Sequence, residues 1–489
     1  MTALPPPPVG FASRPQQEEF RQLLLGVGFE AKTISQFTSR YTIDRANPNL
    51  VDALLASTDS PEPLPILLRT FILGGSVDID RWRNALDVIA FDQWVKAGYV
   101  EERDGKVWGR VALWPFAGYV VASDRDPSST DDPSVVMGMS PSTESLARTA
   151  IRAERVETAL DLGTGTGLLA MILAKTSRTV IATDIEERAL AFARHNATLN
   201  GLSNIEFLRG DGLEPVAGRT FDRVLCNPPY VLAPQMRQRF RDGSATWQRE
   251  LLRSLPSVLN PGGTAQLLSH WPLAPDESPE TVLAPIEDAP VDAEAWVGRI
   301  NTAPSYAAIW APGGEGSAPG DWLRSYVDDG VERVAEGLIS IRRTLEEGEV
   351  AQSITWAPPR LDQDAPRDLE RRLKRGEAVR RTAGAILEEK ILRVCPGVRI
   401  IQETEAREDG WAAPRMRVAH LATVIEERVI DATILALLTR FDGKTELARV
   451  ITALESERSP AAEGSSSPEW REIARDLLED GYVEIVDAS

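Results

Sequence analysis

Cysteine and histidine are scarce in this chain of 489 residues, which contains two cysteines and three histidines. Cys226 and Cys395 lie far apart and in no Cys-x-x-Cys spacing, which argues against a disulfide scaffold and against a zinc ribbon. The three histidines are scattered and form no recognisable set of metal ligands. We therefore expect a protein that contains no structural metal and no disulfide.

Long apolar runs are also missing. No run is long enough to span a bilayer, and the first residues lack the basic and apolar regions of a signal peptide. The composition, with 43% hydrophobic and 26% charged residues, is typical of a soluble globular protein. The sequence thus predicts a cytoplasmic protein with no membrane partner and with room for about three domains.

Positive charge is in short supply, because 54 Lys and Arg residues face 73 Asp and Glu residues, for a net charge of −19. A chain of this charge repels phosphate, which favours a protein or peptide substrate and leaves RNA as the alternative. One predicted helix carries a basic cluster, which we interpret as a solvated helix face because acidic residues interrupt it. The cluster comprises Arg371, Arg372, Lys374, Arg375, Arg380 and Arg381.

A glycine-rich run, DLGTGTG, begins at Asp161 and has glycines at 163, 165 and 167. Apolar residues before and after it predict a strand, a tight turn and a helix, the start of a Rossmann-type unit. Gly163, Gly165 and Gly167 lack the β-carbons that keep a backbone away from a ligand, and the helix points its N-terminus at that ligand. The run alone fits several nucleotide cofactors.

Two acidic residues follow at the ends of the next predicted strands. Asp184 ends the apolar run 179–183, where a carboxylate can accept both hydroxyl groups of a ribose. Asp211 lies in the turn Gly-Asp-Gly after strand 205–208, where it can flank an adenine. Either residue could instead be an ordinary turn or helix-cap aspartate.

The tetrapeptide Asn-Pro-Pro-Tyr at 227–230 follows a fourth predicted strand, 221–226. An amide or aryl amine nitrogen must be turned toward an electrophilic carbon and held in line before it can attack. The Asn227 side-chain oxygen and the Pro228 carbonyl can each accept one N–H group of such a nitrogen, and Tyr230 can stack on a planar substrate. Cys226 is more simply interpreted as a small buried residue than as a nucleophile.

This order of motifs resembles that of the class I S-adenosyl-L-methionine-dependent methyltransferases, over roughly residues 121–359. The resemblance implies an α/β fold with a Rossmann-like core and a cofactor site formed by Asp161, the three glycines, Asp184, Asp211 and Asn227. Within the superfamily, Asn-Pro-Pro-Tyr resembles the amino-methyltransferases, and residues 161–230 resemble the release-factor glutamine methyltransferases most. The resemblance implies N-methylation of a protein or ribosomally made peptide; an exocyclic amine of rRNA or tRNA is the alternative, and a catalytically silent binding protein is a third.

The flanks predict two further modules, residues 1–120 and 360–489. Predicted helices at 64–73, 79–86 and 91–97 precede strands at 98–102 and 107–113, an order typical of a winged helix. Helices are expected at 424–438, 445–454 and 470–478, before a strand that begins with Gly-Tyr-Val-Glu at 481–484. The same tetrapeptide begins the predicted strand at 98–102. Residues 437–451 and this ending resemble small peptide-binding modules that recognise leader sequences. The repeated tetrapeptide suggests that the two modules are similar. The alternative is a chance similarity, because glycine commonly ends a helix before a strand.

Further expectations concern the rest of the core and the connectors. The resemblance places residues 140–143 where related enzymes cover the bound cofactor. Residues 245–259 are expected to form a helix, 264–271 the fifth strand, and 305–310 and 338–343 the last two strands. The proline-rich segment 272–290 is expected to be an extended loop over the site, and residues 312–320 and 456–467 are expected to be connectors. The sequence leaves the oligomeric state open.

Overall fold

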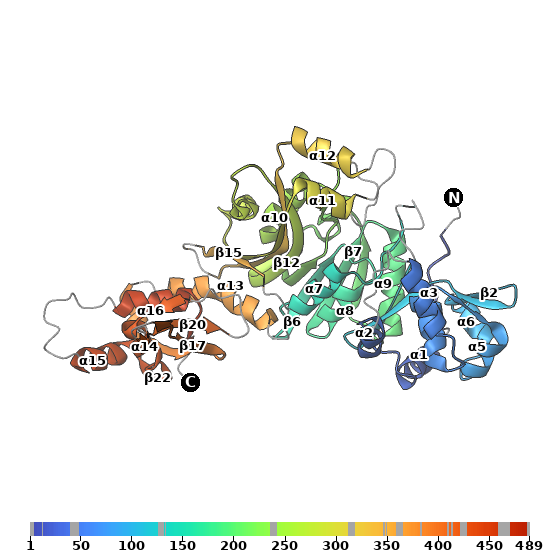
Figure 1. Ribbon diagram of the computed structural model, residues 1–489, viewed down its shortest axis with the longest axis horizontal. Coiled ribbons are helices and arrows are strands. Elements are labelled where there is room, and N and C mark those ends of the chain that lie inside the picture. Colours follow the sequence, from blue (N-terminus) through green and yellow to red (C-terminus); the bar gives the residue numbers. More distant parts are fainter. Residues whose placement is uncertain are drawn as a thin grey trace.

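A computed structural model describes the chain outside residues 1–3, 12, 40–47, 126–131, 133, 235–241, 312–317, 346–347, 349, 358–364, 382–383, 408–409, 412–413, 421–427, 458–469 and 487–489. The described residues form three successive parts along the longest axis of the molecule (Figure 1). The N-terminal part lies at one end, a mixed α/β part lies in the middle, and the C-terminal part lies at the other end.

The middle part is built on a sheet of eight strands in the order β15-β13-β14-β12-β9-β6-β7-β8. These strands are β6 (Val156–Leu162), β7 (Ser177–Asp184), β8 (Ile205–Arg209), β9 (Phe221–Cys226), β12 (Leu259–Leu273), β13 (Val291–Thr302), β14 (Arg333–Arg343) and β15 (Gln352–Trp356). Strand β14 is antiparallel to β12 and β13, and the other pairs are parallel. The expected α/β fold with a Rossmann-like core is thus confirmed.

The helices of the middle part pack on this sheet and its connections (Figure 1). They are α7 (Pro141–Thr149), α8 (Leu168–Ala174), α9 (Glu187–Leu199), α10 (Ala245–Ser254), α11 (Ala303–Trp310) and α12 (Pro319–Asp328). Short 3-10 helices lie at Glu214–Val216, Leu255–Val258 and Pro279–Ile286, and the short strands β10 (Val231–Leu232) and β11 (Asp242–Gly243) pair with each other. The expected fifth strand and the strand at 338–343 are confirmed as parts of β12 and β14.

Two expectations for the edge of the sheet are wrong. Residues 305–310 form helix α11 rather than a strand, because Thr302 caps a helix that has a proline in its first turn. The strand that fills this place is β13, whose buried acidic residues Asp292 and Glu294 hid its strand character. Segment 272–290 is no extended loop: β12 continues to Leu273, and the 3-10 helix Pro279–Ile286 buries three apolar side chains.

The N-terminal part contains a three-stranded sheet of order β1-β3-β2 and the hairpin β4-β5. Its elements are α1 (Arg14–Gly26), α2 (Ala31–Ser39), α3 (Pro48–Ser57), α4 (Pro63–Leu67), the π-helix η1 (Leu68–Ile72), β1 (Ser76–Asp78), α5 (Ile79–Ala85), α6 (Phe91–Lys96), β2 (Val100–Arg103), β3 (Lys106–Gly109), β4 (Ala112–Phe116) and β5 (Tyr119–Ser123). The helices expected at 79–86 and 91–97 and the strand at 98–102 are confirmed. The expected strand 107–113 is instead the end of β3 and the start of β4.

This part shares one hydrophobic core with helix α9 of the central domain. Ala189, Phe192 and Leu199 of α9 pack with the aromatic residues of the N-terminal part. Asn196 also forms two hydrogen bonds with the Ala122 backbone in β5, one through each end of its amide group. The expected boundary at residues 120/121 therefore falls inside a strand that is fastened to the central domain.

The C-terminal part begins with α13 (Ala365–Arg381) and has two three-stranded sheets, β22-β16-β23 and β17-β20-β21. Its other elements are the 3-10 helix Gly384–Glu389, β16 (Ile391–Val394), β17 (Val398–Glu403), β18 (Ala406–Arg407), β19 (Gly410–Trp411), β20 (Arg415–His420), β21 (Arg428–Ile430), α14 (Ala432–Leu438), β22 (Asp442–Glu446), α15 (Leu447–Glu457), α16 (Trp470–Glu479) and β23 (Val483–Val486). The helix 470–478 is confirmed.

The other two C-terminal helices start later than expected. Residues 428–430 form β21, and the helix expected from 424 begins only at Ala432, after the cap Asp431. Residues 442–446 form β22, so the helix expected from 445 begins at Leu447. The connector expected at 456–467 lies almost wholly outside the described residues, as does most of 312–320.

The interpretation of the basic cluster on α13 as a solvated face is wrong for Arg372 and Arg380, while Lys374 is exposed as expected. Arg372 is buried and its Nη1 lies 3.0 Å from Oε1 of Glu294, while Arg380 lies 2.7 Å from Asp292. Both carboxylates belong to the buried strand β13, where an ionised group requires a cation beside it. These arginines therefore join the C-terminal part to the central sheet.

Candidate functional site

The glycine-rich loop connects β6 to α8 at the carboxyl edge of the sheet. Gly163, Gly165 and Gly167 all have positive φ angles, of 72°, 54° and 82°. A β-carbon on Gly167 would lie 2.9 Å from the Cα atom of Ala193 in α9, so this glycine permits close helix packing. At Gly163 and Gly165 a β-carbon would meet no atom within 4 Å, so these two glycines leave open space in front of the backbone.

Asp161 supports this loop from inside the protein. Its Oδ2 atom accepts hydrogen bonds from the Thr164 hydroxyl at 2.6 Å and from the Ala170 N–H at 2.8 Å. Burial raises the pKa of this carboxyl to about 7. The side chain does not line the cavity described below, so in this structure Asp161 acts on a ligand through the loop that it holds.

Asp184 ends β7 next to the same loop. Its Oδ2 atom accepts the Gly165 N–H and its Oδ1 atom accepts the Glu186 N–H, both at 2.9 Å. Burial raises the pKa of Asp184, although both backbone hydrogen bonds favour its ionised form. A carboxylate oxygen can accept more than one hydrogen bond, so Asp184 can still receive two hydroxyl groups of a ligand.

A cavity of about 780 Å³ lies in front of these residues, a size typical of small-molecule sites. The glycine loop, Asp184, Asp211 and Asn227 all line it. Asp211 is exposed on the turn after β8. Residues 134–138 line another side of it. The structure therefore brings together the predicted cofactor residues other than Asp161 around one space.

Asn227 and the two prolines line the cavity from the end of β9. The Nδ2 atom of Asn227 donates to the Thr143 hydroxyl at 2.9 Å. Its Oδ1 atom is buried and has no hydrogen-bond partner among the described residues. A buried acceptor without a donor is costly, and a substrate N–H group can supply that donor. Cys226 is fully buried, and burial raises the pKa of its thiol, in agreement with an inert residue.

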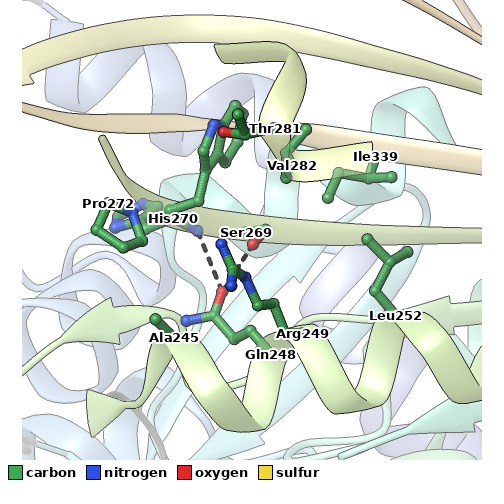
Figure 2. A pocket seen from close by; sticks show the side chains of 11 residues that line it. Ala245, Gln248, Arg249, Leu252, Ser269, His270, Pro272, Thr281, Val282 and Ile339 are labelled. Carbon is green, nitrogen blue, oxygen red and sulfur yellow. Dashed lines mark hydrogen bonds between the residues drawn. The ribbon is translucent and has the colours of Figure 1, made fainter. Parts of the chain in front are cut away.

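Tyr230 is not among the residues that line the cavity, and its stacking on a substrate stays a prediction. Its ring lies 4.5 Å from the His270 ring and 6.2 Å from the Trp310 ring. Its carbonyl accepts a hydrogen bond from Gln248, whose side-chain oxygen accepts the Ser269 hydroxyl and the His270 N–H. Figure 2 shows these last two bonds between α10 and β12. Tyr230 thus anchors the loop in this structure.

Among the residues that line the cavity, sequence reasoning missed Ile185 and Trp247. Ile185 follows the strand-end Asp184 directly and is 39% exposed. A large apolar residue just after a predicted strand end was the sequence signal that could have revealed it. Trp247 lies in the first turn of α10, and its backbone N–H donates to the hydroxyl of the cap residue Ser244. Thr143 belongs to the segment 140–143 that the resemblance places over the cofactor, and it lines the cavity; its hydrogen bond with Asn227 was not expected.

In the described part of the chain, no helix is long and apolar enough to cross a membrane. The same residues contain no cluster of three or more His, Cys, Asp or Glu side chains that could hold a metal ion.

Comparison with known proteins identifies the central domain. Residues 139–275 match the family model "Methyltransferase small domain". The chain is 42% identical over 95 residues to a release factor glutamine methyltransferase of Enterococcus faecalis, covering 19% of this chain and 34% of that protein. It is 43% identical over 125 residues to a ribosomal protein L11 methyltransferase of Rhodopseudomonas palustris, covering 24% of this chain and 41% of the relative.

An RNA enzyme is also among the similar proteins: a 23S rRNA (uracil(1939)-C(5))-methyltransferase of Marinomonas posidonica is 36% identical over 80 residues, which cover 16% of this chain and 18% of that protein. The chain thus spans less than half the length of each of these relatives. The matched region contains the glycine loop, Asp184, Asp211 and Asn227. The central part is therefore a methyltransferase domain of class I, a class that takes its methyl group from S-adenosylmethionine.

Proposed function

We propose that this protein transfers a methyl group from S-adenosylmethionine to a nitrogen of a protein or peptide. The observation that carries the proposal is the position of Asn227. Asn227 lines the same cavity as the glycine loop and Asp184. Its side-chain oxygen has no hydrogen-bond partner among the described residues. The site therefore combines acceptors for a ribose with an acceptor for the N–H group of a methyl-accepting nitrogen.

The residues of the cavity fit S-adenosylmethionine by their chemistry. Asp184 would accept the ribose hydroxyl groups, Asp211 would flank the adenine, and the open backbone at Gly163 and Gly165 would lie against the ligand. When bound, this cofactor supplies a methyl group on a positively charged sulfur that leaves as a neutral thioether. Asp161 would contribute by holding the loop.

The protein's own part in the reaction is to orient the acceptor. Asn227 Oδ1 and the Pro228 carbonyl would accept the N–H groups of the substrate, which turns the nitrogen lone pair toward the methyl carbon. The nitrogen–carbon bond forms as the carbon–sulfur bond breaks, and the electron pair of that bond goes to sulfur. The nitrogen then loses one proton to water, so an amide substrate needs no strong base in the site.

Three observations favour a protein or peptide over RNA. The net charge of −19 opposes a phosphate backbone, and the basic cluster on α13 is occupied by buried ion pairs. Two of the similar proteins described above bear names of enzymes that modify translation proteins. An exocyclic amine of rRNA or tRNA is the second candidate.

The flanking parts would then select the substrate. Residues 1–120 form a winged-helix-like module and residues 360–489 a helical and winged module in this proposal, with the methyltransferase core at 121–359. The order of helices and the three-stranded sheet β1-β3-β2 support the first assignment. Either module can bind protein or nucleic acid, so the fold alone does not decide between the two substrate classes.

The test uses three parallel incubations of the full-length protein with radiolabelled S-adenosylmethionine. The first contains a purified bacterial release factor, the second a host protein extract and the third host RNA. We expect label in protein, located on a nitrogen by mass spectrometry, and a labelling rate lower by about a hundredfold or more when Asn227→Ala replaces the parent. Label confined to RNA would refute the protein proposal, above all if RNA affinity fell by orders of magnitude between about 50 and 200 mM salt. Absence of label from all three substrates, with no cofactor binding, would refute the enzyme itself.

A further inference from the structure

The orientation of the Asn227 side chain depends on a residue from outside the Asn-Pro-Pro-Tyr motif. The Asn227 Nδ2 atom donates to the Thr143 hydroxyl at 2.9 Å, and the Oδ1 atom has no partner among the described residues. An amide can rotate by 180° and exchange its oxygen and nitrogen at little cost unless a neighbour distinguishes them. Within the described ranges, Thr143 is the one hydrogen-bond partner of this amide.

The hydroxyl of Thr143 is itself part of a chain of hydroxyl groups. It lies 2.9 Å from the hydroxyl of Ser140, the cap of helix α7, which accepts the Thr143 N–H and lies 2.8 Å from the Ser142 hydroxyl. A threonine hydroxyl has one proton and two lone pairs. If its proton goes to Ser140, Thr143 can only accept from Asn227, and the amide must then direct its NH₂ group at Thr143.

Helix α7, which contains Thr143, is attached to the central sheet. At the other end of the helix, the side chain of Gln266 in β12 accepts the Ile151 N–H at 2.7 Å and donates to the Thr149 carbonyl at 3.0 Å. Gln266 is buried in the central sheet, next to the strand that carries Asn227. Thr143 and Asn227 are thus fixed to the same sheet, which keeps their separation constant.

We propose that Thr143 is a positioning residue, which holds the Asn227 carboxamide with its nitrogen toward α7 and its oxygen toward the methyl-accepting nitrogen. This inference rests on the proposed function. The reverse orientation would present two N–H donors to a substrate that itself donates N–H groups, and the substrate nitrogen would lose its acceptor. Correct orientation therefore affects methyl transfer and leaves the cofactor site unchanged.

The test needs no methyl acceptor, because it compares two cofactor analogues. S-adenosylhomocysteine lacks the methyl group, and sinefungin has an amine in its place, whose N–H groups can reach the oxygen of Asn227. Calorimetry gives the affinity of each analogue for the full-length protein. We expect Thr143→Val to weaken sinefungin about tenfold and to leave S-adenosylhomocysteine unchanged, since one hydrogen bond to a cation is lost.

Three further variants make the result specific. Thr143→Ser keeps the hydroxyl and should restore the sinefungin affinity of the parent. Thr149→Val, on the same helix, removes a hydroxyl that bonds only within α7 and should change neither affinity. Asn227→Ala should lose the preference for sinefungin as fully as Thr143→Val. Thr143→Ala replaces the valine variant if thermal unfolding shows that the valine is not accommodated.

Each possible result decides a definite point. An unchanged sinefungin preference in Thr143→Val, together with its loss in Asn227→Ala, would overturn the role of Thr143 and leave the proposed function standing. A preference that survives in Asn227→Ala would refute both the orientation of Asn227 and the inference. A parent protein that binds neither analogue would refute the proposed function instead.

Discussion

Replacing Asp184 by alanine is the most direct test of the cofactor site. The Asp184 carboxylate accepts two backbone N–H groups at 2.9 Å, one from Gly165 in the glycine loop and one from Glu186. It lines the cavity and has acceptor capacity left for a ribose. The alanine variant therefore loses every hydrogen bond to the ribose and also releases the Gly165 N–H, which loosens the loop.

The expected loss of affinity follows from the number of hydrogen bonds. A hydrogen bond to a charged group contributes about 1.5–3 kcal/mol, and a ribose offers two hydroxyl groups. Water that enters the vacated space offsets part of this loss. Even a single unreplaced bond gives a change of about 1.4 kcal/mol, so we expect S-adenosylmethionine to bind at least tenfold more weakly to Asp184→Ala.

Calorimetric titration measures this change, and Asp222→Ala provides a matched control. Asp222 also accepts two backbone N–H groups through its carboxylate, those of Glu157 and Thr158, but it lies outside the cavity lining. The control should unfold at a lower temperature and bind the cofactor with the parent's affinity. Equal affinity in Asp184→Ala and the parent would remove Asp184 from the site, and equal losses in both variants would show a general effect of instability.

Four further predictions follow from the structure. Asn227→Ala should slow single-turnover methylation about a hundredfold or more, on the order of 3 kcal/mol, with unchanged cofactor affinity; methylation at the parent's rate would contradict its role. Burial raises the pKa of Asp161 in the folded protein to about 7, so folding disfavours its ionised form. Asp161→Asn should therefore gain thermal stability relative to the parent as pH rises from about 4 to 7, and a constant difference in unfolding temperature would contradict this. Arg372→Met should lower stability by about 3–5 kcal/mol in denaturant unfolding, since its buried carboxylate partners lose their cation; unchanged stability would refute the pairing. Residues 121–359 alone should aggregate or unfold at a lower temperature than the full chain, because they expose Phe192; a soluble fragment with the parent's stability would contradict the shared core.

The sequence predicted the cofactor half of the sheet well, because its signals are local. Glycines 163, 165 and 167, the acidic residue that ends β7 and the tetrapeptide after β9 each report on their own backbone and on the strand beside them. Parallel strands then bring these points to one edge, whatever the rest of the chain does. For that reason the strands from β6 to β9, and the residues that line the cavity from their ends, followed from the printed residues.

The second half of the sheet was harder to predict because its residues depend on distant partners. Asp292 and Glu294 resemble loop residues until Arg380 and Arg372 of α13 are placed beside them. The arginines in turn resembled a solvated face as long as β13 was missing. The sequence assigned no element to residues 291–302, and a buried ion pair can be recognised only when both partners are known.

Tyr230 illustrates the same limit inside the site. Its motif suggested stacking on a substrate, and the structure adds a contact of its ring with His270 that the motif did not predict. His270 comes from β12, beyond a loop and a helix, and no periodicity in the sequence links the two rings.

The arrangement around the cofactor cavity argues that the N-terminal part belongs to the catalytic unit. Residues 134–138 line the cavity, and the Asp124 carboxylate, next to β5, accepts the Val136 N–H at 2.8 Å. Arg188 of α9 pairs with this carboxylate in a nearly buried position and also donates to the Pro5 carbonyl at 2.7 Å. One guanidinium group thus links the first residues of the chain, the cavity lining and the helix behind the glycine loop. Removing the N-terminal segment should therefore break a contact of Arg188, the residue that also pairs with Asp124 behind the cavity lining.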